Sequence, residues 1–141
     1  MEMAKTVRDA MTPNVHAVAP SDSLAEAAEI MSGEDIGSLP VVVNGRLVGV
    51  LTDRDIVVRA VAEHVTPESL NVGDVATRQP VTVAPDDDLD EALRLMGHHR
   101  VRRLPVVEDG HLVGMISQAD LAAQAKERKV GEMVEEISKP D

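Results

Sequence analysis

Two long apolar runs in the chain are each followed by a hydroxyl residue that has an aspartate three residues later: Thr52 with Asp55, and Ser117 with Asp120. Each pair follows an apolar run and precedes helix-forming residues, so each is expected where a strand ends and a helix begins. Backbone N–H groups and a hydroxyl at a helix start can bind a phosphate, and the nearby carboxylate can accept two hydrogen bonds from a ribose diol. The same spacing occurs in ordinary helix caps. Considered alone, the spacing indicates a cap more often than a ligand site. The two roles are compatible, so both pairs are candidates for nucleotide binding.

A basic segment at 98–103, His-His-Arg-Val-Arg-Arg, is the second feature that could do chemistry. A run of charge is often simply a solvated face. Arg102 and Arg103, however, directly precede an apolar run at 104–107 that is typical of a buried strand. Because a guanidinium can pair with two phosphate oxygens at once, these arginines are candidates for phosphate binding.

The sequence offers little for other chemistries. There is no Cys, which excludes disulfides, thiol catalysis and zinc–thiolate sites. The five His have no metal-ligand spacing, and neither a Gly-rich phosphate loop nor a catalytic serine motif occurs. There is also no Phe, Tyr or Trp, so a bound adenine would have to lie between aliphatic side chains. We therefore predict no catalytic site and no metal site.

Composition places the protein among globular domains. The 141 residues are 43% hydrophobic, which is enough for one compact domain or two small halves. The net charge of −11 opposes a nucleic-acid surface. The N-terminus has no apolar stretch typical of a signal peptide, and no apolar run approaches membrane-spanning length. We expect a soluble cytoplasmic protein without nucleic-acid or membrane partners.

The elements that must position these residues follow from an internal repeat. Asp55 and Asp120 are 65 positions apart (120 − 55), and this shift aligns residues 7–63 with 72–128 without a gap. Such a match indicates a tandem duplication. We place repeat 1 at 7–65, repeat 2 at 72–128 and a tail at 129–141, whose apolar spacing favours a short helix although Gly131 weakens it.

Each repeat predicts the order strand, helix, strand, strand, helix. Short strands are expected at 15–18 and 81–83, and capping-box signatures at Ser23 and Asp88 start the first helices. Asn-Gly at 44–45 and Asp-Gly at 109–110 lie between apolar runs, which predicts two-residue hairpins. The last helices are expected at 53–63 and 118–127. Gly49 and Gly114 are expected where another backbone approaches the strand closely.

These segments together resemble a CBS domain: Met-Thr-Pro at 11–13, Leu-Pro-Val-Val at 39–42, Asn-Gly at 44–45 and Leu-Thr-Asp-Arg-Asp-Ile at 51–56. Two copies resemble a CBS pair, or Bateman module, of the stand-alone bacterial kind that includes hypoxic response proteins. The resemblance implies an α/β (α+β) fold in which two β-α-β-β-α units pack with pseudo-twofold symmetry and leave two clefts between them.

The resemblance also implies which residues bind a ligand. The family often binds AMP, ADP, ATP or S-adenosylmethionine in these clefts, as a regulatory ligand and not as a required cofactor. Cleft A would use Ser117, Asp120 and Arg103, with a base pocket of Thr12, Ala17, Ile36, Gly37 and Ser38. Cleft B would use Thr52 and Asp55, with Thr77, Thr82, Val101 and Arg102 near the base. Because Ser38 stands in cleft B where cleft A has Arg103, we expect cleft A to be the better phosphate site.

Three functions remain open on the sequence. The first is a non-enzymatic regulatory module that binds an adenine nucleotide and regulates an unidentified protein. The second is a ligand-free interaction module, and the third, least supported, is an enzyme. We also expect a homodimer, because the last helices carry a small apolar patch: Ile56, Val57, Ala60 and Val61 in repeat 1, and Leu121, Ala122 and Ala125 in repeat 2.

Overall fold

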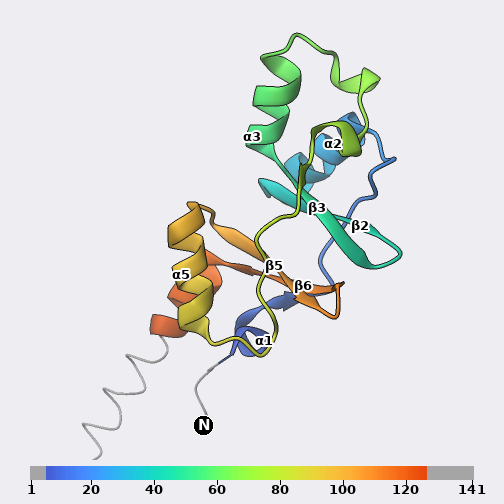
Figure 1. The fold of residues 1–141 in the computed structure, drawn as a ribbon. Helices are drawn as coiled ribbons and strands as arrows, with labels where there is room; N and C mark the ends of the chain where they lie inside the picture. Colours follow the sequence, from blue (N-terminus) through green and yellow to red (C-terminus); the bar gives the residue numbers. More distant parts are fainter. Residues whose placement is uncertain (1–5, 127–141) are drawn as a thin grey trace, which may run out of the picture.

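The computed structural model describes residues 6–126 of the protein. It forms two lobes of similar construction that share a six-stranded antiparallel sheet (Figure 1). The strands pair in the order β1-β6-β3-β2, with β4 beside β3 and β5 beside β6. The predicted mixed class of helices and strands in two equivalent halves is confirmed.

Each lobe has one long helix, a β-hairpin and a second helix after the hairpin. The first lobe contains α2 (Leu24–Glu34), β2 (Ser38–Val43), β3 (Arg46–Thr52) and α3 (Asp53–Ile56), which continues as the π-helical turn η1 (Val57–Val61). The second lobe contains α5 (Leu89–His99), β5 (Arg103–Glu108), β6 (His111–Ser117) and a helix over 118–126. The remaining short elements are α1 (Val7–Ala10), β1 (Thr12–Pro13), η2 (Pro67–Ser69), α4 (Val72–Val75) and β4 (Thr77–Arg78).

Both predicted hairpin turns are confirmed. Asn44 and Gly45 have φ angles of 52° and 79°, and Asp109 and Gly110 have φ angles of 52° and 82°. Two successive positive φ angles match the right-handed twist of the paired strands, and Asn, Asp and Gly tolerate them best. The two hairpins even shift register at equivalent places, between residues 41 and 42 and between 106 and 107.

The long helices begin at the predicted caps. The Ser23 side chain accepts the Glu26 N–H at the start of α2, and the Asp88 side chain accepts the Glu91 N–H at the start of α5. Each helix ends at a residue in the left-handed conformation, Asp35 or Arg100. The buried faces of both helices carry Leu, Ala and Met, so each lobe has an aliphatic core.

Two predictions of secondary structure are wrong in detail. The strands expected at 15–18 and 81–83 reduce to single parallel bridges, Val18 with Val41 and Val83 with Val106, because the chain runs beside the hairpin at only one residue. The helix expected at 53–63 ends at residue 61. Its last turn is π-helical, and the Ala62 N–H donates to the Val57 carbonyl five residues earlier. The helix expected at 118–127 is present through 126, and the predicted tail helix lies outside the described residues.

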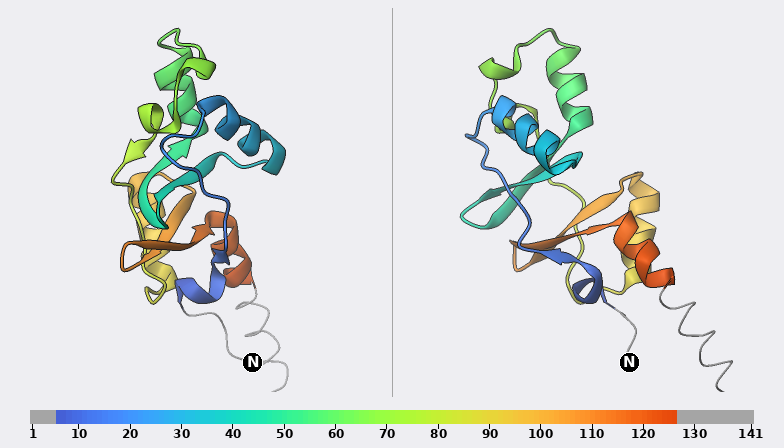
Figure 2. Two further views of the ribbon diagram at one scale, coloured as in Figure 1. Left: turned by 90° about the vertical axis from the view of Figure 1, so that its right-hand side faces the viewer. Right: turned by 180° about the vertical axis from the view of Figure 1, so that it is seen from behind.

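The N-terminal segment of each repeat packs on the other lobe (Figure 2). Strand β1 pairs with β6, and β4 pairs with β3. Val7 of α1 is fully buried in the core of the second lobe, while Val72 and Val75 of α4 are buried in the core of the first. Each lobe therefore packs against the N-terminal helix and strand of the other repeat, and this reciprocal packing holds the lobes together.

The crossing strands explain Gly49 and Gly114. A Cβ on Gly49 would lie 2.7 Å from the Thr77 carbonyl oxygen, and one on Gly114 would lie 2.7 Å from the Thr12 carbonyl oxygen. Both distances are shorter than a carbon and an oxygen tolerate, so only glycine allows the exchanged strands to approach. The predicted reason for these two glycines, close backbone packing, is confirmed.

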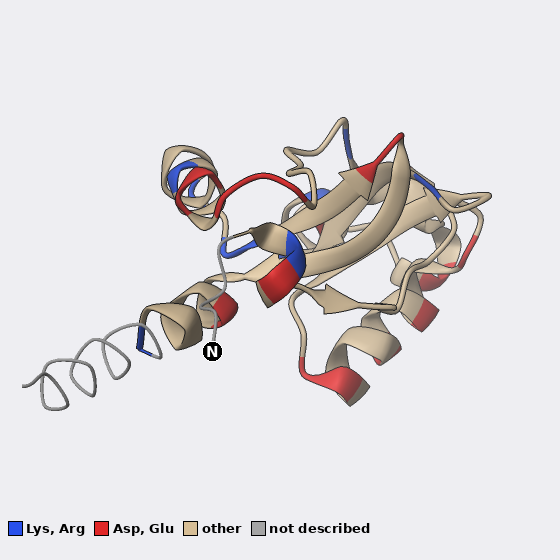
Figure 3. Ribbon diagram, turned by 90° about the horizontal axis from the view of Figure 1, so that it is seen from below, with Lys and Arg blue, Asp and Glu red and all other residues tan. Residues whose placement is uncertain are grey.

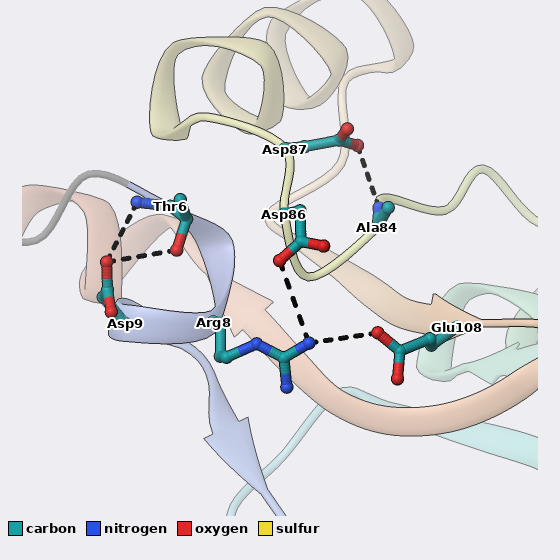
Figure 4. A network of polar contacts seen from close by, with 7 residues as sticks. All are labelled: Thr6, Arg8, Asp9, Ala84, Asp86, Asp87 and Glu108. Atoms are coloured by element: carbon teal, nitrogen blue, oxygen red, sulfur yellow. Dashed lines mark hydrogen bonds and ion pairs between the residues drawn. The ribbon is translucent and has the colours of Figure 1, made fainter.

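A polar network reinforces one side of the exchange (Figure 4). The Arg8 guanidinium on α1 lies 3.0 Å from the Glu108 carboxylate on β5 and 3.9 Å from Asp86. The Asp9 carboxylate accepts the Thr6 N–H and hydroxyl. The three side chains of these ion pairs are 47–86% exposed, so the ion pairs orient α1 on the second lobe more than they stabilise it.

Candidate functional site

A cavity of about 460 Å³ lies where β1 and β2 face the end of β6. Cavities that bind small molecules are commonly roughly 300–1,000 Å³. The residues that line this cavity come from both repeats: Thr12, Asn14, Val15, His16, Glu34, Ile36, Ser38, Pro40, Arg103, Met115, Ser117 and Asp120. They include most of the predicted cleft A, so the name cleft A is kept for this cavity.

Ser117 and Asp120 form a reciprocal cap at the helix that begins at 118. The Ser117 hydroxyl accepts the Asp120 N–H at 3.1 Å, and Asp120 Oδ2 accepts the Ser117 N–H at 2.9 Å. Within residues 6–126, no hydrogen bond reaches Asp120 Oδ1. The cap therefore fixes the carboxylate on the wall of the cavity and leaves one oxygen for a ligand donor.

Arg103 and Ser38 begin the equivalent strands β5 and β2, and both line cleft A. Arg103 is exposed and has no ion pair with any residue of the described range 6–126. The Ser38 hydroxyl oxygen is buried and has no hydrogen-bond partner. An unpaired guanidinium and an unsatisfied hydroxyl in one cavity are suited to an anionic, polar ligand.

His16 and Glu34 form an ion pair on another part of the same wall. His16 Nδ1 lies 3.2 Å from Glu34 Oε2, and both side chains are 47% exposed. His16 precedes the bridge residue Val18, and Glu34 is the last residue of α2. The pair is charged on both sides only when the imidazole is protonated.

Cleft B has the same cap but a different neighbour. Thr52 and Asp55 exchange hydrogen bonds of 3.0 Å at the start of α3. The Thr77 hydroxyl, on β4 of the other repeat, donates to Asp55 Oδ1 at 3.1 Å. Each oxygen of Asp55 therefore already accepts a hydrogen bond from the protein. Thr12, the counterpart of Thr77, makes no such bond to Asp120 in the described part of the chain.

Some predicted site residues lie apart from these groups. Ala17 and Gly37 do not line the cavity of cleft A. Gly37 instead accepts the Asp53 N–H at 2.9 Å through its carbonyl, and a Cβ there would lie 3.0 Å from the Asp53 carboxylate. In cleft B, Thr82, Val101 and Arg102 are exposed, and no hydrogen bond in the described range joins them to Thr52, Asp55 or Thr77.

His16 and Glu34 are the lining residues with ionisable side chains that the sequence analysis missed. One signal for His16 was its place within the predicted first strand, beside Ala17. A signal for Glu34 was a carboxylate at the C-terminal end of a predicted helix, where the helix dipole disfavours negative charge. The remaining missed residues, such as Asn14 and Met115, carry no charge and gave no comparable signal.

Charged residues lie mainly on helices and loops, while the strands are mostly uncharged (Figure 3). Among residues 6–126, no group of three or more His, Asp or Glu side chains is placed to hold a metal ion. No helix in the same range is long and apolar enough to cross a membrane.

Comparison with known proteins agrees with this architecture. The CBS domain family model matches residues 7–61 and 72–127. The chain belongs to the CBS domain family. It is a tandem CBS pair, a regulatory module, and is 37% identical over 134 residues to the CBS domain-containing protein YhcV of Bacillus subtilis, covering 94% of this chain and 95% of YhcV. It is 36% identical over 136 residues to hypoxic response protein 1 of Mycobacterium tuberculosis, covering 96% and 95%.

Solved structures show the same CBS-pair fold. A crystal structure of Hypoxic Response Protein I with two coordinated zinc ions has a TM-score of 0.77 and 38% identity, covering 84% of this chain and 97% of that one. A crystal structure of CBSX2 in complex with AMP has a TM-score of 0.77 and 34% identity, covering 88% and 98%. Inosine-5'-monophosphate dehydrogenase of Korarchaeum cryptofilum also matches, but over only 25% of its length, so this CBS pair corresponds to one region of that larger enzyme.

Proposed function

We propose that this CBS pair regulates another protein by binding an adenosine-containing nucleotide of the AMP, ADP or ATP class in cleft A. The observation that carries the proposal is the arrangement of three groups in one cavity: Arg103 without an ion pair, Asp120 with an uncommitted oxygen, and Ser38 with an unsatisfied hydroxyl. A guanidinium suits phosphate, and a carboxylate at a capped helix start suits a ribose diol. The structure of the relative CBSX2 with AMP supports this choice of ligand class.

The roles of the lining residues follow from their chemistry. Arg103 would hold the phosphate, while Ser117 and Asp120 would hold phosphate and ribose. Thr12, Ile36 and Ser38 would contact the base, which would lie between aliphatic groups because the chain has no Phe, Tyr or Trp. Binding of the nucleotide in preference to catalysis on it is consistent with the stand-alone relatives, which match this chain over nearly their whole length.

Calorimetric titration of Arg103→Ala tests the proposal. Because a charge-assisted hydrogen bond contributes about 1.5–3 kcal/mol, the variant should bind AMP about ten- to a hundredfold more weakly than the wild type, and adenosine about equally well. Arg78→Ala is the control, since Arg78 is exposed and belongs to neither predicted binding site. A wild-type protein that binds neither adenosine nor AMP at millimolar concentration would contradict the proposal and favour the ligand-free interaction module.

A self-association surface is the second part of the proposal. Val57, Val58 and Val61 on η1 are 56%, 48% and 59% exposed. Two residues of the predicted patch, Ala60 and Leu121, are instead buried in the lobe cores, whereas Ala122 and Ala125 are exposed. We expect a homodimer through the outward valines, since exposed aliphatic side chains gathered on one helix mark interaction surfaces.

Light scattering at tens of micromolar tests the dimer. The wild type should have twice the monomer mass. The double variant Val57→Asp, Val61→Asp should have the mass of one monomer. A matched change at Val43, which is 45% exposed on a hairpin, should leave the mass unchanged. A monomeric wild type would contradict the dimer without affecting the nucleotide proposal.

A further inference from the structure

The fixed charges around cleft A are unbalanced. Arg103 contributes one positive charge, whereas Glu34 and Asp120 contribute two negative ones. His16 adds a positive charge only when protonated. With a neutral His16 the cavity therefore has a net charge of −1 (one cation and two carboxylates). One phosphate group can pair with Arg103, but further phosphate groups would meet no second fixed cation among the residues that line this cavity.

The position of Glu34 is unfavourable for the helix that carries it. The C-terminal end of a helix is the negative end of its dipole and prefers cations. Helix α5 follows this rule with His98 and His99 in its last turn, but the last turn of α2 contains no basic residue and ends in Glu34. A residue that breaks a local preference is expected where function requires it. Because Glu34 lines the cavity, we expect that its role concerns the ligand bound in cleft A.

The contact with His16 keeps Glu34 at the cavity. Their separation of 3.2 Å gives the carboxylate a partner that, when neutral, adds no positive charge to the cleft. Both carboxylates and Arg103 line a single cavity of about 460 Å³. Fields of exposed charges extend over roughly 8 Å at physiological ionic strength, so Glu34 acts on those phosphate groups of a ligand that come within about this distance of it.

We infer that Glu34 is a specificity-determining residue that makes cleft A prefer nucleotides with a single phosphate group to those with two or three. This inference rests on the proposed function. Arg103 compensates for the first phosphate. Each additional phosphate adds negative charge that Glu34 and Asp120 repel, in a protein whose net charge is already −11. AMP is therefore bound in preference to ADP, and ADP in preference to ATP.

Calorimetric titrations with adenosine, AMP, ADP and ATP, without divalent cations, test the inference on Glu34→Gln. This change removes the charge and keeps the shape. The control is Glu29→Gln, which makes the same change in net charge on the same helix at an exposed residue that does not line the cavity. Thermal unfolding of both variants verifies that they fold.

The wild type should bind AMP at least about tenfold more tightly than ATP. Glu34→Gln should reduce that ratio by about three- to tenfold and leave adenosine affinity unchanged, while Glu29→Gln should keep the wild-type ratio. Equal wild-type affinities for AMP and ATP, or equal ratios in the two variants, would overturn the inference and leave the proposed function standing. Absence of binding by all four ligands would overturn both.

Discussion

Cleft A and cleft B are built from equivalent residues of the two repeats, yet they present their aspartates differently. In both, a hydroxyl residue and an aspartate cap the helix that follows the hairpin. In cleft B, the Thr77 hydroxyl donates a hydrogen bond to Asp55 Oδ1 at 3.1 Å. In cleft A, Asp120 Oδ1 has no such partner in the described chain. The motif therefore does not decide whether the carboxylate is open. What decides it is whether the threonine on the crossing strand hydrogen-bonds to the carboxylate, as Thr77 does and Thr12 does not within the described residues.

Removing each aspartate should have the largest effect and would break the comparison most directly. Asp120→Ala and Asp55→Ala each delete one capping carboxylate, which should cost about 0.5–2 kcal/mol of stability. Asp55→Ala should cost about 0.5–1.5 kcal/mol more, because the Thr77 hydroxyl also loses its acceptor. Asp120→Ala should also weaken adenosine and AMP binding about tenfold or more, because the ribose loses its acceptor. Asp55→Ala should change it less than about threefold. Calorimetry and denaturant unfolding measure the two effects.

The outcome that contradicts the assignment is a reversal. If Asp55→Ala abolishes nucleotide binding and Asp120→Ala leaves it intact, cleft B is the ligand site. Equal losses of nucleotide affinity in both variants would mean that the two clefts are equivalent despite the Thr77 hydrogen bond.

The crossing strands offer a second comparison. Gly49→Ala and Gly114→Ala should each destabilise the protein by about 1–3 kcal/mol, since overpacking forces the backbone of β4 or β1 to move. Only Gly114→Ala should also weaken nucleotide binding, because it displaces Thr12, which lines cleft A. Urea unfolding and calorimetry with AMP provide the measurements.

Gly97→Ala on α5 is the matched control, because a Cβ at Gly97 would meet no atom within 4 Å. It should stabilise the protein by about 0.5–1 kcal/mol, as alanine is the better helix former. A neutral Gly114→Ala would show that β1 does not press against β6 in solution.

The smallest effect should come from the two threonines across the clefts. Thr77→Val removes the hydrogen bond to Asp55 and should lower the free energy of unfolding by about 0.5–1.5 kcal/mol. Thr12→Val removes no hydrogen bond to Asp120 and should change the stability by less than about 0.5 kcal/mol. Equal losses in urea unfolding would mean that Thr12 also bonds to its aspartate, which would remove the difference between the clefts.

Local features were the ones that the sequence predicted best. The turns at 44–45 and 109–110 depend on two residues that tolerate positive φ, and the caps at Ser23 and Asp88 depend on one side chain and a nearby N–H. Both interactions span three residues or fewer, so the residue types decide them. The strand predicted at 15–18 failed for the opposite reason. Its pairing partner, Val41, lies on another element, and how many residues run alongside it depends on the packing of the chain.

The residues of the candidate site also divide into those held by local interactions and those brought together by the tertiary structure. Ser117 and Asp120 were found from their spacing, because the cap that holds them is local. His16 and Glu34 belong to segments 18 residues apart that meet only on the cavity wall, and no spacing rule joins them. The difference between Asp55 and Asp120 was equally hidden, since the sequence places a threonine, Thr77 or Thr12, opposite each of them.

By itself, the sequence determined that the protein is a duplication and that its halves fold alike. A gapless shift of 65 residues repeats every turn, cap and apolar face. Only the tertiary structure decided that each repeat gives its first helix and strand to the other lobe, with Val7 buried in one core and Val72 in the other. The physical reason is that the two copies carry equivalent apolar residues at these positions. Hydrophobic burial is non-directional, so either core could accept either helix, and the approach of β1 to Gly114 and of β4 to Gly49 depends on the packed chain.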